Sequence, residues 1–188
     1  MKGSPVAAAF AFALLLSATQ AAAQHLVINE IDYDQPGPDM DEFIEIYNPG
    51  PAPQDLTDMV LVFVNGATNT PYLTIPLGPA GTLPAAGYMV VASATVTVAP
   101  GATVLRFASA QDNIQNGSPD GIVFFLGETA VRAYVYEGES ACAELEGAEA
   151  VPAQSNDAPE LSSNRCDSGA WALLPPTPGS LPASGACP

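Results

Sequence analysis

The sequence predicts an all-β protein, built as an antiparallel sandwich or barrel, on two observations. Short apolar runs rich in Val, Ile, Phe and Tyr recur along most of the 188 residues. Gly, Pro, Asn and Asp separate these runs, and those residue types favour turns over continued strands or helices. A series of short strands joined by such turns is typical of sandwiches and barrels.

The first residues predict export. Lys2 gives a positive start, residues 7–16 form an unbroken apolar run, and residues 21–23 supply the small-residue pattern of a cleavage site. We interpret residues 1–23 as a signal peptide that is removed near Ala23. The apolar run is shorter than the ~20 residues that span a bilayer, and we expect no transmembrane segment in the mature chain. The predicted localisation is therefore secreted or periplasmic.

Eight strands are expected in the first 136 residues. The continuous apolar runs 61–64 and 122–126 predict central strands that are covered on both faces. In the second strand the pleat places Ile44 and Ile46 together on one face, which we assign to the core. The predicted strands are 25–32, 42–47, 59–65, 71–76, 87–93, 103–108, 121–126 and 130–136.

The last third of the sequence has a different composition. Residues 138–160 are rich in Ala and Glu, which predicts a long loop insertion, with a turn of helix near residues 143–147. Residues 170–174 hold the only Trp and predict a final strand. We expect one domain over residues 24–175, followed by a disordered Pro- and Gly-rich tail over residues 176–188.

The charge of the chain is strongly negative. The formal net charge is −16, and Arg106, Arg132 and Arg165 are the only strong cations after residue 2. Because binding to nucleic acid depends on Lys and Arg that neutralise phosphates, we expect no direct nucleic-acid binding. The excess of carboxylates has two readings, which are solubility and the binding of divalent cations.

Three cysteines allow one disulfide, with three alternative pairings. Export would place them where disulfides persist. We favour Cys142–Cys166, because both lie before the terminal tail. Cys187 would then be a free thiol or would link two copies into a disulfide dimer.

An acidic cluster is the best candidate site. Seven carboxylates fall within residues 30–45, and the turn at residues 35–38 can fold the later ones back towards the earlier ones. Oxygen ligands of this kind suit calcium, although the spacing is not that of an EF-hand. The alternative is a solvated acidic turn whose side chains bind local backbone amides. No cofactor is required, and the candidate calcium ligands are Asp32, Asp34, Asp39 and Asp41.

Several segments resemble the lamin-tail domain family. Residues 26–48 (LVINEIDYDQPGPDMDEFIEIYN) contain the most specific of its motifs. Weaker motifs follow in the family's order at residues 56–61, 83–92, 120–136, 161–169 and 171–179. The resemblance covers about residues 25–180. It implies an immunoglobulin-like antiparallel β-sandwich that serves as a binding module, here as a stand-alone domain of the kind found in secreted bacterial proteins.

The sequence offers little to an enzyme. His25 is the single histidine and sits at the expected mature terminus, and no nucleophile motif or phosphate-binding loop is found. We therefore predict a secreted, non-catalytic binding module whose partner is a protein or a cell surface. Two alternatives stay open: a calcium-binding adhesion or matrix module, and an accessory subunit of a secreted hydrolase or nuclease.

Overall fold

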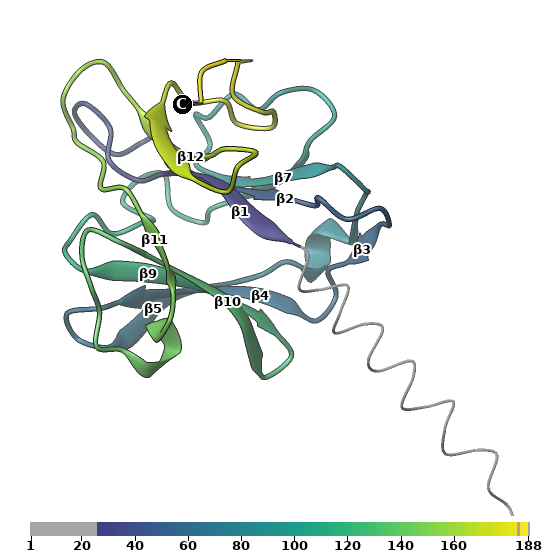
Figure 1. Cartoon of the computed structure of the whole chain (residues 1–188), viewed down its shortest axis with the longest axis horizontal. Helices are drawn as coiled ribbons and strands as arrows, with labels where there is room; N and C mark the ends of the chain where they lie inside the picture. The colour runs from purple at the N-terminus through teal and green to yellow at the C-terminus, as the bar shows by residue number, and fades with distance from the viewer. Residues whose placement is uncertain (1–25, 184, 188) are drawn as a thin grey trace, which may run out of the picture.

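The computed structural model describes residues 26–183 and 185–187, and it forms two β-sheets that pack face to face (Figure 1). The predicted signal peptide and His25 lie outside the described residues. One sheet forms the upper layer in Figure 1 and carries β1, β2, β7 and β12. The other forms the lower layer and carries β4, β5, β9 and β10.

The upper sheet has six strands in the order β13-β12-β1-β2-β7-β8, and only the β7–β8 pair is parallel. A register shift between Ile28 and Glu30 marks a β-bulge in β1, and it brings Glu30 directly opposite Glu45. The strands are β1 (Val27–Asp32), β2 (Phe43–Tyr47), β7 (Tyr88–Ala92), β8 (Thr103–Arg106), β12 (Ser162–Arg165) and β13 (Trp171–Leu174).

The lower sheet has five strands in the order β11-β10-β9-β4-β5, with β10 and β11 parallel. These are β4 (Met59–Asn65), β5 (Thr70–Pro76), β9 (Asp120–Leu126), β10 (Thr129–Tyr136) and β11 (Glu149–Val151). The remaining elements are the paired short strands β3 (Gln54–Asp55) and β6 (Thr82–Leu83) and two 3-10 turns, η1 (Gly78–Ala80) and η2 (Ala143–Leu145). Within the described residues, no helix has the length and apolar character needed to cross a bilayer.

The core lies between the two sheets. Alternation along the strands directs Ile44 and Ile46 into it, as the sequence predicted, and both are fully buried. Tyr33 and Tyr136 stack there with their ring centroids 4.5 Å apart. The Tyr134 hydroxyl accepts the backbone N–H of Ile28 at 2.9 Å, which joins the two layers across the core. Burial of each large apolar side chain stabilises the fold by about 1.5–3 kcal/mol.

All eight predicted strands are present, with ends shifted by at most two residues, and the final strand at Trp171 is confirmed. Strands β3, β6, β11 and β12 were not predicted. β12 has the sequence SSNR, which carries no apolar signal. Its Ser162, Ser163 and Asn164 are nevertheless buried. The strand forms because its polar side chains bind buried partners, and a hydrophobicity pattern cannot reveal that.

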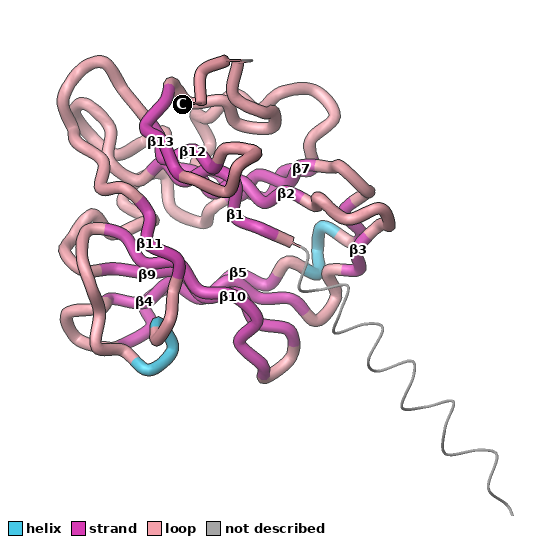
Figure 2. Tube along the Cα trace, in the orientation of Figure 1, coloured by secondary structure: helices cyan, strands magenta, loops and turns pink. Residues whose placement is uncertain are grey.

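The prediction of a disordered tail is wrong for the described part of the tail. The segment after β13 returns across the outer face of the upper sheet, where loops cover the strands (Figure 2). The backbone N–H of Ala99 donates to the carbonyl of Pro178 at 2.9 Å, and Thr177 and Gly179 bind buried carboxylates. These hydrogen bonds offset the entropy cost that composition alone would assign to ordering such a segment.

Candidate functional site

Four carboxylates of the opening motif are completely buried. Glu30 and Asp32 lie on β1, Glu45 lies on β2, and Glu42 immediately precedes β2. Glu30 and Glu45 alternate with the core-facing isoleucines and therefore point to the outer side of the upper sheet. The C-terminal segment and neighbouring loops cover that side, so these carboxylates are removed from water without entering the main core.

Glu30 holds three separate parts of the chain together. Its carboxylate accepts hydrogen bonds from the hydroxyl of Ser162 and the amide of Asn164, both on β12. It also accepts the backbone N–H and the hydroxyl of Thr177 at 2.9 and 3.0 Å. Burial raises the pKa of Glu30 above its ordinary value, and these donors oppose that shift.

Glu45 makes the second link to the C-terminal segment. It accepts the side-chain amide of Asn29, the bulge residue, at 2.7 Å, and the backbone N–H of Gly179 at 2.6 Å. Burial, and next the negative charge of Glu30, raise the pKa of Glu45 to about 8. Gly179 has φ +93°, and a Cβ there would meet backbone and side-chain atoms of the loop around Ala99 at 3.0 Å.

Glu42 positions a loop in the same way. Its two oxygens accept the backbone N–H groups of Asn113 and Ile114 at 2.8 and 2.7 Å, and one oxygen also accepts the Asn113 side-chain amide. Burial raises the pKa of this carboxyl as well. The three glutamates thus bind donors of their own chain, an arrangement that orders loops and presents no open carboxylate pair to a substrate.

Asp32 is different, because only part of its carboxylate is bound. One oxygen accepts the side-chain amide of Gln35 at 2.8 Å, and the other has no donor among the described residues. The carboxylate of Glu160, from the loop before β12, lies within hydrogen-bonding reach of Asp32. Burial, joined by the negative charges of Glu160 and Glu30, raises the pKa of Asp32 to about 8.

The structure does not bring the four predicted calcium ligands together. Asp32 is buried, whereas Asp41 is exposed. Asp39 accepts the backbone N–H of Gln35 at 3.2 Å and the side-chain amide of Asn116 at 3.1 Å. Among the residues described, no group of three or more His, Cys, Asp or Glu side chains is arranged to hold a metal ion. Calcium binding by Asp32, Asp34, Asp39 and Asp41 together stays a prediction.

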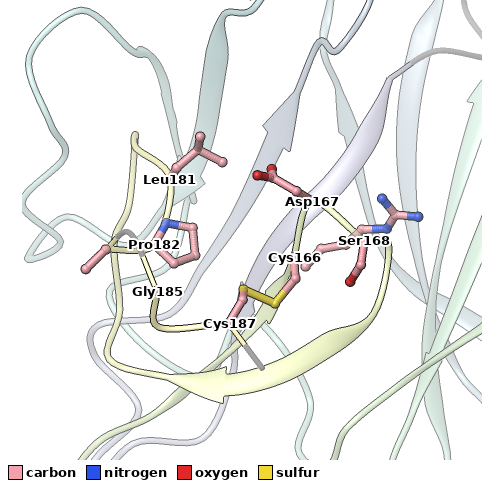
Figure 3. Close-up of a pocket in the computed structure, with 9 residues that line it drawn as sticks. Cys166, Asp167, Ser168, Leu181, Pro182, Gly185 and Cys187 are labelled. Carbon is pink, nitrogen blue, oxygen red and sulfur yellow. A yellow bond between two sulfur atoms is a disulfide. The ribbon is translucent and has the colours of Figure 1, made fainter.

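The predicted disulfide is wrong in its pairing. Cys166 is joined to Cys187 at an S–S distance of 1.94 Å and a Cα–Cα distance of 5.9 Å (Figure 3). Cys142 is buried instead beside Val64 and Leu145 on the outer face of the lower sheet. The expected pairing failed because the tail was taken as disordered, although its return across the sheet carries Cys187 back to Cys166. A dimer through Cys187 is therefore ruled out in this structure, since that sulfur is already bonded within the chain.

The disulfide borders a pocket of about 410 Å³ between the C-terminal segment and the turn after β12 (Figure 3). Leu181 and Pro182 form one wall, and Asp167 and Ser168 lie across from them. Arg165 also lines the pocket, but its Nε donates to Glu149 at 3.0 Å. The pocket therefore has a mixed lining, with the polar side chains of Asp167 and Ser168 opposite apolar atoms of Leu181 and Pro182.

A half-buried apolar surface lies on the outer face of the lower sheet. Val60, Val62 and Phe125 on the adjacent strands β4 and β9 point away from the core and are only partly covered. The expectation that both faces of these central strands are covered was therefore only partly correct. A pocket of about 170 Å³ opens on this face, lined by Val62, Val64, Asn69, Pro71, Phe125 and Cys142.

Sequence reasoning identified Glu30, Asp32 and Glu45 as members of the opening motif but missed the residues that complete their surroundings. Glu160 and Thr177 come from segments taken as loop and tail, more than 120 residues from β1. Neither segment has a periodicity that would place these side chains on the sheet. The short polar stretch that forms β12 was the signal in the sequence that could have indicated a strand with buried polar side chains beside β1.

The two packed, mainly antiparallel sheets define an immunoglobulin-like β-sandwich. Members of this class are commonly interaction modules, and the buried carboxylates here order loops of the same chain. The family model for the lamin tail domain matches residues 19–141, and the chain belongs to that family, which is non-enzymatic and immunoglobulin-like. The match ends before β11, so the resemblance noted at residues 161–179 lies beyond it. No curated protein is similar enough to the sequence to count as a match.

Proposed function

We propose that this protein is an exported, non-catalytic binding module that recognises a protein with a basic surface. The observation that carries this proposal is the apolar outer face of β4 and β9. Its side chains are only half-buried, and they lie outside the main core between the two sheets. Family membership supports the proposal, because lamin tail domains are of the interaction-module type. An apolar patch on a sheet face is a common contact surface for a partner.

The charges around this face indicate the chemistry of the partner. Asp58 and Glu128 are exposed at the end of the face where β4 begins, and Glu139 is exposed near its other end, beside the contact between Ser140 and Gly66. Acidic groups at both ends favour a partner whose own apolar contact is flanked by Lys and Arg. A separate secreted hydrolase with a basic surface is one such partner, as is a cell-surface protein.

The surface is tested by photocrosslinking in the exported protein in its native host. A photoreactive residue at Val62 should give adducts that become weaker at high salt, because the charges at the rim steer association. The matched control carries the same residue at Ser109, which is exposed on a loop outside this face. Equal adducts at both positions, or none at Val62, would contradict the proposed surface.

The non-catalytic assignment has its own test. Purified protein is assayed against ester, phosphodiester and glycoside substrates, alongside Glu45→Gln protein whose folding has been checked by circular dichroism. We expect no turnover by either protein. Turnover that the wild-type protein retains through purification, and that folded Glu45→Gln protein lacks, would show that the buried carboxylates are catalytic.

A further inference from the structure

A second site lies where β1 leaves the upper sheet, and it is independent of the proposed interaction surface. Two buried acceptor oxygens there have no donor among the described residues: Oδ2 of Asp32, which is 0% exposed, and Oε1 of Gln35, which is 4% exposed. Buried polar atoms are nearly always hydrogen-bonded, and each exception calls for a physical explanation.

The surroundings increase the negative potential at these oxygens. Glu160 and Glu30 are the charged groups that act on the Asp32 carboxyl, and both are anions. The two arginines of the upper sheet bind other groups: Arg165 on the adjacent strand β12 donates to Glu149, and Arg106 on the edge strand β8 donates to the carbonyl of Ser93. The buried Asp32 carboxylate, with the half-buried Glu160 carboxylate beside it, favours a positive partner, because a carboxylate removed from water without a cation or a full set of donors is costly.

We propose that Asp32, Glu160 and Gln35 form a binding site for a calcium ion. Two carboxylates and an amide carbonyl are the hard oxygen ligands that Ca²⁺ prefers, and water can complete its flexible coordination shell. The side-chain amide nitrogen of Gln35 donates to Oδ1 of Asp32 at 2.8 Å. This hydrogen bond keeps the side-chain carbonyl oxygen of Gln35 close to the Asp32 carboxylate. The site shares only Asp32 with the ligand set predicted from the sequence.

The neighbouring contacts keep these ligands in place. Asp39 accepts the backbone N–H of Gln35, which fixes the turn after β1. The side-chain carbonyl of Gln154, in the same loop as Glu160, accepts the backbone N–H of Tyr33 at 2.9 Å. The turn that carries Gln35 is therefore positioned before any ion arrives, which lowers the entropy cost of binding.

An entry path leads from solvent to Glu160. A pocket of about 280 Å³ is lined by Glu160 and Asp41, together with threonines of the loop after β7 and prolines of the C-terminal segment. Its two carboxylates would attract a cation towards the site. Occupation of the site would fasten the 138–160 loop to β1, so calcium should stabilise the whole domain.

The first test measures thermal unfolding of the exported protein in EDTA and in millimolar calcium. At 100 times the dissociation constant, calcium should raise the midpoint by about 5–10 °C. Glu160→Gln should abolish the shift, because it removes one of the two charged ligands. The variant should still fold, because Glu160 is only half-buried. The matched control is Asp157→Asn, three residues earlier in the same loop and exposed, which should keep the full shift.

A second measurement does not depend on unfolding. Terbium, a luminescent substitute for calcium, should bind wild-type protein with emission sensitised by nearby Tyr33, and calcium should displace it. Glu160→Gln should reduce the emission at least tenfold. The proposal is overturned if wild-type protein shows neither a calcium shift nor displaceable terbium emission. It is also overturned if Glu160→Gln keeps the shift while Asp34→Asn loses it, which would assign calcium to the acidic turn.

Discussion

Replacing Glu45 with Gln should flatten the dependence of folding stability on pH. Glu45 is completely buried and its folded pKa is raised from 4.5 to about 8, first by burial and then by the charge of Glu30. The folded protein therefore holds a proton that the unfolded chain releases above about pH 4.5. The stability contributed by the protonated group is fully present below that pH and is lost as the pH rises towards 8.

The magnitude follows from the difference between the two pKa values. Each pKa unit corresponds to about 1.4 kcal/mol, so Glu45 alone contributes at most about 5 kcal/mol between pH 4.5 and 8. The hydrogen bonds from Asn29 and Gly179 favour the ionised form, but burial is the larger effect and sets the direction. The Gln side chain copies the protonated carboxyl in size and charge and cannot ionise.

Urea unfolding at pH 5, 6, 7 and 8 in EDTA measures this dependence, because urea is uncharged. The free energy of unfolding of wild-type protein should fall with rising pH, and Glu45→Gln should reduce the slope by up to about 1.4 kcal/mol per pH unit. The control is Glu139→Gln, whose exposed carboxylate should leave the slope unchanged. A wild-type stability that rises with pH over this range, or a slope that Glu45→Gln does not alter, would refute the reasoning.

Three further predictions concern the C-terminal segment and the loops. Replacing Cys166 and Cys187 with Ser should lower the free energy of unfolding by about 3 kcal/mol, measured by urea unfolding, because the disulfide closes a loop with a sequence separation of 21; an unchanged stability would contradict the observed pairing. Gly179→Ala should lower the thermal midpoint more than Gly37→Ala. Both glycines have positive φ, but only at Gly179 would a Cβ meet neighbouring atoms at 3.0 Å. Equal effects would show that backbone strain alone sets the loss of stability. Glu42→Gln should lower the free energy of unfolding by about 2 kcal/mol and speed proteolysis of the 109–114 loop. The amide can accept only one of the two backbone N–H groups that the carboxylate now binds. An unaltered cleavage rate would show that Glu42 does not order this loop.

Much of the fold could be predicted from the sequence because strand alternation is a local signal. The pleat alone placed Ile44 and Ile46 in the core, and the apolar runs of β4 and β9 alone made them central strands. The acidic cluster was also visible. Its partners were not, because Glu160, Ser162 and Thr177 reach it through contacts between segments more than 100 residues apart.

The sequence by itself determined the fold class, the family and the strong negative charge, because short-range patterns of apolar and turn residues carry that information. Only the tertiary structure decided which acidic side chains are buried, which cysteines pair and whether the Pro- and Gly-rich tail is ordered. Glu30 and Glu45 would face water on an isolated sheet, and they become buried because Thr177 and Gly179 donate hydrogen bonds to them. The same return of the chain brings Cys187 to Cys166. These outcomes depend on the packing of distant segments, which no local pattern of residues encodes.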